Sequence, residues 1–282
     1  MWIWLGDIIY ADTEDMAKMK SLYNEQKTQE NYQTFRHKYP IIGIWDDHDY
    51  GVNDGDKTYP KKAESQQLLL DFLDVPKSAE VRDREGAYQS FTIGPENQKV
   101  KIILLDARYF RDDLKKDFVG KKRYVPNENG GILGETQWKW LEAELTNSNA
   151  QVHLIASGIQ IIPEEHRFEK WANFPKERQR LFSLLQEKNT ARTILLSGDR
   201  HIAEVSKIKL DKLDDPIYEI TSSGLTHSYE AAGDEVNKHR VGSLTGKKNF
   251  GLLLFDWSKQ ELQINAEVRG VENEIIIQEK LF

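Results

Sequence analysis

Cysteine is absent from this chain of 282 residues. Its absence excludes disulfide bonds, zinc sites built from thiolates and cysteine nucleophiles, although it leaves the cellular compartment open. No apolar run reaches the roughly 18 residues of a membrane-spanning helix. The formal net charge is -7 and no strong basic stripe is present. This charge pattern argues against a protein that wraps duplex nucleic acid.

Two further classes of catalytic motif are missing. Neither Ser157 nor Ser222 stands in the G-x-S-x-G pattern of a serine nucleophile elbow. The chain also has no glycine-rich phosphate loop of the P-loop or dinucleotide-binding type. Hydrophobic residues make up 39% and charged residues 30% of the sequence. Such a composition is ordinary for a soluble globular protein with a large core.

Three apolar, strand-like runs each end in a cluster of ionisable residues. The runs start at Ile3, Ile41 and Thr193, and the clusters occupy residues 7–10, 46–49 and 199–201. Open α/β sheets place their active sites just beyond the carboxyl ends of strands, so we expect the clusters to meet. Carboxylate, imidazole and phenol groups gathered in this way suit hard metal ions. The pattern predicts a metal-dependent hydrolase.

Each cluster also has a structural interpretation. Tyr10 alone is more typical of a packing residue than of a metal ligand. Residues 46–49 cost desolvation energy unless they pair or bind metal, and the alternative is a solvated turn. Asp199 and His201 lie on one side of an extended chain, where a salt-bridged surface turn is the alternative.

Periodicity predicts an α/β architecture in a single domain over residues 1–282. Helices are expected over residues 14–24, with Asp12 or Thr13 as N-cap, and over 61–73, 135–146 and 175–187. Strands are expected over 88–93, 100–105, 152–156, 203–210, 217–222, 251–256 and 262–268. Residues 112–134 are polar and glycine-rich, which predicts a long loop. The late strands predict antiparallel pairing.

Seven motifs together resemble the PhoD-like alkaline phosphatase/phosphodiesterase family of metallophosphoesterases. They cover nearly the whole chain in the family's order: WLGDIIYAD, WDDHDYGVND, LLDARYFRD, LGETQWKWLEAEL, EKWANFPKERQRL, LSGDRHIAEVS and TSSGLTHS. The resemblance implies a calcineurin-like sandwich with mixed central sheets flanked by helices. It also implies hydrolysis of phosphate esters by metal-activated water, and a periplasmic or secreted location.

The resemblance assigns metal ligands residue by residue. Calcium and ferric iron are the implied metals, with other divalent ions as alternatives. Asp7 falls on the metal-bridging carboxylate, and Tyr10 falls on the iron-binding tyrosine. Asp47 lies where broader metallophosphoesterases carry a ligand asparagine, with Asp46 as the neighbouring alternative. The remaining implied ligands are Asn53 for calcium, and Asp199 and His201 from the last motif, with His201 on the iron side.

Three residues are expected to act on the substrate. His48 matches the family histidine that faces the phosphate, and it would protonate the leaving group. Arg108 follows another strand and could contact phosphate through two hydrogen bonds. Its alternative role is an ion pair with Asp106 or Asp112. His227 is expected to line the pocket, and the alternative is that it caps a strand.

The chain departs from the family pattern at its start. The family carries an upstream Gly-Ser-Cys motif whose cysteine binds iron, whereas this chain begins at the second motif, with Met1 directly before an apolar run and no signal-peptide pattern. We therefore expect an N-terminal piece and one iron ligand to be missing; a tidy edge strand is the alternative. The alternative functions are a phospholipase D-like or nucleotide phosphodiesterase, or an inactive metal-binding fragment.

Overall fold

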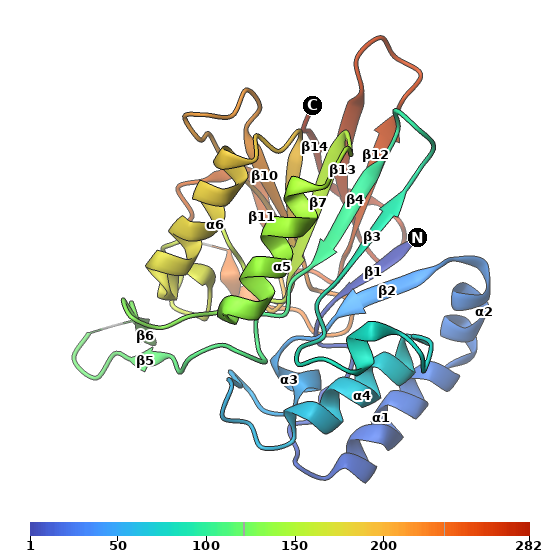
Figure 1. Ribbon diagram of the computed structural model, residues 1–282, viewed down its shortest axis with the longest axis vertical. Coiled ribbons are helices and arrows are strands. Elements are labelled where there is room, and N and C mark those ends of the chain that lie inside the picture. The colour runs from blue at the N-terminus through green and yellow to red at the C-terminus, as the bar shows by residue number, and fades with distance from the viewer. Residues whose placement is uncertain (121, 234) are drawn as a thin grey trace.

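The centre of the fold is a seven-stranded mixed sheet (Figure 1). The computed structural model describes residues 1–120, 122–233 and 235–282. In spatial order the strands are β11 (Arg240–Thr245), β9 (Ala203–Ile208), β10 (Ile217–Ser222), β8 (Thr193–Ser197), β7 (Val152–Ser157), β4 (Val100–Leu104) and β3 (Gln89–Ile93). Strands β10, β8, β7 and β4 run parallel, and the outer strands pair antiparallel.

Two helices, α5 (Gly134–Thr146) and α6 (Pro175–Glu187), cover one face of this sheet (Figure 1). Successive strand residues point to opposite faces. The odd-numbered Ile103, Ile155 and Leu195 therefore face the helices, where they join a buried cluster with Trp138 and Leu181. The alternation of the strands and the apolar stripe of each helix together fix this layer.

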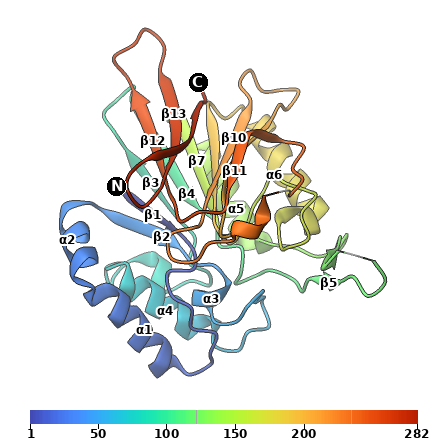
Figure 2. The same ribbon diagram turned by 180° about the vertical axis from the view of Figure 1, so that it is seen from behind.

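Two small sheets cover the opposite face. One pairs β1 (Trp2–Leu5) with β2 (Ile41–Ile44) in parallel. The other is antiparallel, with the order β12 (Phe250–Asp256), β13 (Gln263–Arg269) and β14 (Ile275–Lys280). Figure 2 shows β12 and β13 from this side. The even-numbered Leu104, Leu154 and Leu196 pack here with Trp4 and Ile264. The molecule is thus layered as helices, central sheet and two small sheets.

Four helices lie at the end of the molecule next to β1 and β2 (Figure 1). They are α1 (Met16–Thr28), α2 (Glu30–Lys38), α3 (Asp47–Tyr50) and α4 (Lys62–Phe72). The predicted N-cap of α1 was wrong, because neither Asp12 nor Thr13 caps it. The cap is Asp15, whose Oδ1 accepts hydrogen bonds from the backbone N of Ala17 at 2.9 Å and of Lys18 at 3.1 Å.

The predicted α/β class, with mixed sheets flanked by helices, is confirmed. Helix α2 and strands β11 and β14 were not predicted. Helix α2 has no fully buried residue, and only Tyr32 and Phe35 of its nine residues pack against aromatic side chains of β1, too few to show a helical period. The predicted long loop contains two short paired strands, β5 (Lys115–Lys116) and β6 (Tyr124–Val125).

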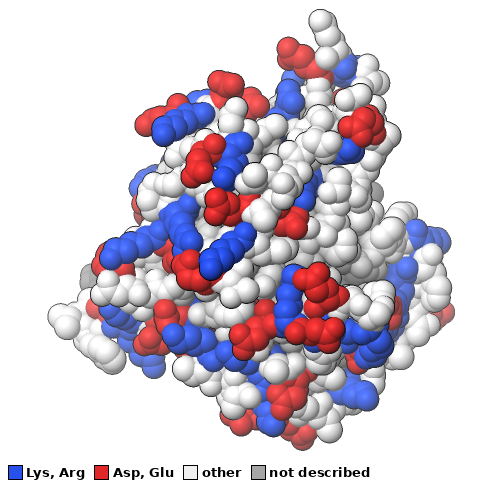
Figure 3. All heavy atoms as spheres, viewed as in Figure 1, with Lys and Arg blue, Asp and Glu red and all other residues white. Residues whose placement is uncertain are grey.

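Charge is spread over the surface. Lysine and arginine alternate with aspartate and glutamate across the face drawn in Figure 3, without a large area of one sign. Within the described ranges, no helix is long and apolar enough to cross a membrane.

Candidate metal centre

Three strand ends bring acidic residues together at one place. Asp7 follows β1, Asp46 and Asp47 follow β2, and Asp199 follows β8. Their ligand atoms fall into groups whose members lie within 4.8 Å of one another. The groups are Asp7 with Asp47 and His48; Asp46 with Asp47 and Asp199; and Asp47 with Asp54 and Glu169. Asp47 belongs to all three groups and marks the centre of the site.

The backbone turns sharply where these side chains emerge. Asp7, Asp199 and His201 have φ values of 50°, 64° and 53°. This left-handed region is uncommon for residues other than glycine, and it often marks functional sites. A close approach reinforces the turn, since a Cβ added to Gly6 would lie 2.2 Å from the Cβ of Asp46. Glycine at position 6 thus allows the ends of β1 and β2 to meet.

Hydrogen bonds hold the carboxylate of Asp47 in one orientation. Its Oδ1 accepts a bond of 2.9 Å from the backbone N of His48, and its Oδ2 accepts one of 2.6 Å from the backbone N of Asp54. Asp49 supports the same turn, because its two carboxylate oxygens accept from the backbone N of Asp46 at 2.7 Å and of Ile8 at 3.3 Å.

Tyr10 connects the first strand end to the last. Its hydroxyl lies 2.8 Å from Nε2 of His201 and 3.2 Å from Oδ2 of Asp7. The ring centroid of Tyr10 lies 3.9 Å from that of His227 and 4.5 Å from that of His48. The three histidines and the phenol therefore form one wall of the site. Burial, together with the Asp7 carboxylate, raises the pKa of Tyr10 far above its ordinary value.

His48 is a partly exposed residue of this wall. Its Nδ1 lies 2.7 Å from Oδ2 of Asp12. Burial alone would lower the pKa of His48, but the carboxylates of Asp47, Asp7 and Asp12 outweigh it and raise the pKa above 6.5. The imidazole is therefore oriented by Asp12, and the neighbouring carboxylates favour its charged form.

The site concentrates negative charge. Burial, followed by the repulsion of neighbouring carboxylates, raises the pKa of Asp7 and Asp46. Burial likewise raises the pKa of Asp199, with Asp47 adding to the effect. Asp47 differs, because Arg108, His48 and its backbone bonds overcome burial and lower its pKa. Among the described residues, Oδ1 of Asp7 and Oδ2 of Asp46 are buried without a hydrogen-bond partner.

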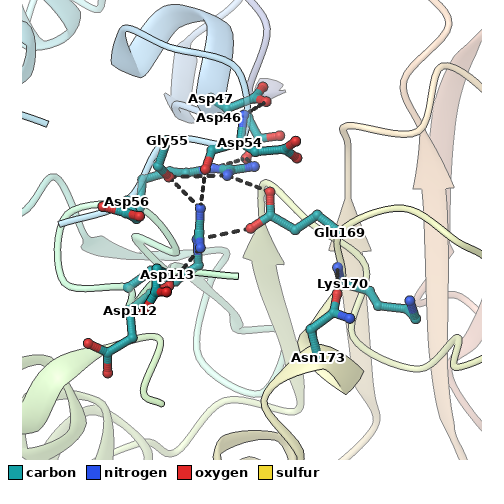
Figure 4. A network of polar contacts seen from close by, with 12 residues as sticks. Asp46, Asp47, Asp54, Gly55, Asp56, Asp112, Asp113, Glu169, Lys170 and Asn173 are labelled. Carbon is teal, nitrogen blue, oxygen red and sulfur yellow. Dashed lines mark hydrogen bonds and ion pairs between the residues drawn. The ribbon is translucent and has the colours of Figure 1, made fainter. Parts of the chain in front are cut away.

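A buried charge network supports the carboxylates (Figure 4). Nε of Arg108 donates to Oδ1 of Asp46 at 2.8 Å, and its Nη1 donates to Oε2 of Glu169 at 2.6 Å. Nε of Arg111 lies 2.9 Å from the other oxygen of Glu169. Nη2 of Arg111 donates to the carbonyl oxygens of Asp54 and Gly55, at 2.5 and 2.7 Å.

The expected role of Arg108 needs a correction. The side chain has no exposed surface, so no part of its guanidinium is open to a phosphate in this structure. The alternative, an ion pair, describes it better, but the partners are Asp46 and Glu169 rather than Asp106 or Asp112. Asp106 instead accepts a bond of 2.9 Å from the backbone N of Arg108.

Among the other residues singled out in the sequence, Asn53 is not a member of the three acidic groups but adjoins Asp54, a member of the third. It is exposed, and its Nδ2 donates to Oδ2 of Asp54 at 2.8 Å. His227 lies beside Tyr10, as expected of a residue that lines the site. Glu169 and Arg111 were not singled out, because nothing in their local spacing indicates that they fold against the end of β2.

Comparisons with known proteins place the chain in a family. A model of the family described as PhoD-like phosphatase matches residues 1–266. Alkaline phosphatase D of Bacillus subtilis (strain 168) is 22% identical over 220 residues, which cover 71% of this chain and 38% of that protein. This chain therefore spans well under half the length of that relative.

Two solved structures share the fold. The structure of PhoD superposes with a TM-score of 0.73 at 18% identity, covering 100% of this chain and 66% of that one. GAP50, the anchor in the inner membrane complex of Plasmodium, gives 0.59 at 14% identity, covering 100% of this chain and 78% of that one. The fold, the order of the motifs and the family match over residues 1–266 agree, and this chain belongs to the PhoD-like phosphatase family.

Proposed function

We propose that the chain hydrolyses phosphate esters with metal ions held at the three strand ends. The observation that carries the proposal is Asp47, whose carboxylate is shared by three acidic groups. Buried carboxylates at this density repel one another unless cations neutralise them. Membership of a phosphatase family supports a phosphate ester as the substrate.

The donor atoms fit the proposed metals. The buried carboxylate oxygens of Asp7 and Asp46 that lack a hydrogen-bond partner are available as ligands for a cation. Carboxylate and amide oxygens suit calcium, so we assign it to Asp7, Asp47, Asn53 and Asp199. We assign ferric iron to Tyr10 and His201, with Asp7 shared, because the phenol oxygen and the imidazole nitrogen face each other at 2.8 Å. Bound metals would neutralise phosphate charge and acidify a water molecule.

Two side chains, His48 and Arg108, have separate roles in the proposed reaction. Water attacks phosphorus, the bond to the ester oxygen breaks, and the leaving oxygen needs a proton. His48 would supply this proton, because Asp12 orients its ring and the neighbouring carboxylates raise its pKa. Arg108 acts indirectly, through Asp46, by holding that carboxylate beside the metal site. By resemblance to alkaline phosphatase D, we propose an extracytoplasmic location.

Hydrolysis of a nitrophenyl phosphate monoester and diester, with calcium and iron supplied, tests the proposal. We expect turnover by the chain, and a loss with Asp47→Ala, which removes the ligand oxygens. The exposed Asp83→Ala is the matched control and should leave turnover unchanged. Bound metal is measured in parallel. Metal binding without turnover of either ester would contradict the proposed activity and favour a metal-binding fragment.

A further inference from the structure

Two neighbouring apolar side chains are more exposed than any other large apolar residue among those that the structure describes. Phe118 has 89% and Val119 has 99% of its surface exposed, whereas the next, Val271, reaches 77%. The pair lies in the turn between β5 and β6, and we call residues 115–120 and 122–125 the tip hairpin. Adjacent apolar side chains held in water on this scale often mark a site of interaction.

The tip hairpin projects from the molecule. Figures 1 and 2 both show β5 and β6 extending away from the central sheet and its covering helices. In Figure 3, uncharged atoms form the left-hand extremity of the molecule, at the place of this hairpin in Figure 1. A broad surface could therefore contact the tip before it meets the rest of the protein.

The turn that presents the apolar pair is held by one side chain. Oδ1 of Asp117 accepts hydrogen bonds from the backbone N of Val119 at 3.2 Å and of Gly120 at 2.6 Å. Its Oδ2 accepts a third, from the backbone N of Lys122 at 3.0 Å. A Cβ added to Gly120 would lie 2.2 Å from Oδ2 of Asp117, so this close approach requires glycine. These contacts order the backbone of the tip and leave both apolar side chains in solvent.

The base of the tip hairpin is attached beside the metal centre. Nη2 of Arg123 lies 2.6 Å from Oδ2 of Asp54, and the hydroxyl of Tyr124 donates to the same oxygen. The backbone N of Asp54 in turn donates to Asp47, the residue shared by all three acidic groups. The hairpin therefore projects from the rim of the metal centre.

Basic side chains surround the apolar pair. Lys115, Lys116 and Lys122 are exposed, and none of them takes part in an ion pair with another residue that the structure describes. Arg123 is a fourth cation, with 40% of its side chain exposed. Asp117 is the acidic residue of the tip hairpin, and backbone N–H groups already occupy its carboxylate. The hairpin is thus basic, although the formal net charge of the whole chain is -7.

We propose that the tip hairpin docks the protein on an anionic lipid bilayer. Phe118 and Val119 would enter the boundary between the headgroups and the acyl chains, where apolar side chains leave water. The lysines would remain among the anionic headgroups, because their long stems can reach past the apolar tip. Stable membrane binding usually needs two such signals together. The proposal does not rest on the proposed hydrolysis.

Other partners fit the tip hairpin less well. A stable contact between proteins buries roughly 800 Å² on each side, whereas two side chains at a projecting tip offer far less. Single-stranded nucleic acid binds rows of aromatic side chains along a basic groove, and Val119 has no ring on which a base could stack. A bilayer requires no minimum contact area, because lipid molecules surround whatever part of the tip is inserted.

Binding of the full chain to vesicles tests the proposal. Vesicles of phosphatidylcholine alone are compared with vesicles of phosphatidylcholine and phosphatidylserine in equal parts, and bound protein is measured by sedimentation. We expect binding only to the anionic vesicles, and a loss of binding as salt screens the charges. Phe118→Ser/Val119→Ser should weaken binding at least about tenfold. Lys115→Gln/Lys116→Gln should weaken it about 30-fold, from about 1 kcal/mol for each lysine.

Matched controls remove the same groups elsewhere. Lys20→Gln/Lys38→Gln deletes two exposed positive charges from α1 and α2, and Val271→Ser deletes an exposed valine from the turn between β13 and β14. Both control variants should bind the anionic vesicles as the wild type does. Melting temperatures are measured in parallel, and the tip variants should keep the wild-type value because the replaced side chains are exposed.

A single fluorescent label locates the contact. The chain contains no cysteine, so Val119→Cys provides one thiol for an environment-sensitive fluorophore and keeps Phe118 in place. Brominated lipids in the anionic vesicles should quench this label. The same label on Val271→Cys, the matched control, should not be quenched.

Several results would overturn the proposal. These are no binding to the anionic vesicles, equal binding to phosphatidylcholine alone, equal losses in the tip and control variants, or equal quenching at positions 119 and 271. If a tip variant does not fold, the labelled chain decides, because an unquenched label at position 119 in the presence of anionic vesicles would equally reject the proposal.

Discussion

Glu169 accepts a hydrogen bond of 2.6 Å from Nη1 of Arg108, and neither side chain reaches solvent. The same carboxylate pairs with Arg111, whose guanidinium holds the carbonyl oxygens of Asp54 and Gly55. The carboxylate of Glu169 therefore connects Arg108, which binds Asp46, with Arg111, which binds the backbone at Asp54 (Figure 4). Its removal leaves two buried arginines without their shared partner.

We expect Glu169→Ala to lower the free energy of unfolding by about 3–5 kcal/mol, the usual cost of removing one member of a buried ion pair. Urea denaturation measures it. Glu128→Ala is the matched control, because Glu128 is exposed and its loss should cost about 0.5 kcal/mol or less. An equally small cost for both variants would contradict a structural role for the network.

The proposed acid can be tested through its leaving group. If His48 protonates the leaving oxygen, His48→Ala should lower turnover by about 10²–10⁴-fold for esters with poor leaving groups. The loss should be small for nitrophenol esters, which leave without a proton. His37→Ala, in an exposed helix position, serves as the control. An equal loss across leaving groups would indicate that His48 only positions the phosphate.

The buried carboxyl group of Glu219 should make the free energy of unfolding depend on pH. Burial raises its pKa from 4.5 to about 7, although the backbone N–H groups of Ile162 and Ile161 oppose the shift. Between these two values the folded state keeps a proton that the unfolded state has lost. The contribution of Glu219 is therefore fully present below pH 4.5 and is lost as the pH rises to about 7.

The raised pKa of Glu219 corresponds to a change of about 3 kcal/mol in the free energy of unfolding between pH 4.5 and 7. Glu219→Gln should flatten the fall in unfolding free energy between pH 4.5 and 7, as followed by denaturant titration at each pH. The exposed Glu187→Gln should leave the slope unchanged. The same slope in wild type and Glu219→Gln would show that Glu219 does not hold its proton in the folded state.

Metal binding should stabilise the fold. Calcium that binds only the folded state at about 100 times its dissociation constant would add about 2.7 kcal/mol. A thermal melt with and without calcium measures it, and a chelator should reverse the gain. Asp47→Ala should reduce the response, since that carboxylate is shared by all three acidic groups. A calcium response that is unchanged in Asp47→Ala would place the bound ion elsewhere.

The parts of the site that sequence alone could predict are those set by strand ends. Asp7, Asp47 and Asp199 each follow an apolar run directly, so their meeting follows from the placement of strands in the sheet. Glu169 lies far along the chain in irregular structure, where no periodicity predicts its place. The partners of Arg108 likewise depend on how separate segments pack.

In the fold, too, local sequence predicted some elements, whereas others depend on long-range packing. Nearly continuous apolar runs predicted β4 and β7, because the side chains on both faces of these strands pack in buried layers. Helix α2 has no buried residue and was missed. The pairing of β1 and β2 as a separate two-stranded sheet was also beyond prediction, since it depends on long-range contacts rather than on local sequence.

The positive φ angles at Asp7, Asp199 and His201 affect how the site should be mutated. Asparagine and aspartate tolerate the left-handed region better than alanine does, and β-branched residues tolerate it worst. Alanine scanning at these positions would therefore combine lost chemistry with added backbone strain. Asparagine keeps the turn and removes only the charge or the imidazole. In a library that allows all amino acids, selection for folding alone should enrich glycine, asparagine and aspartate at these three positions.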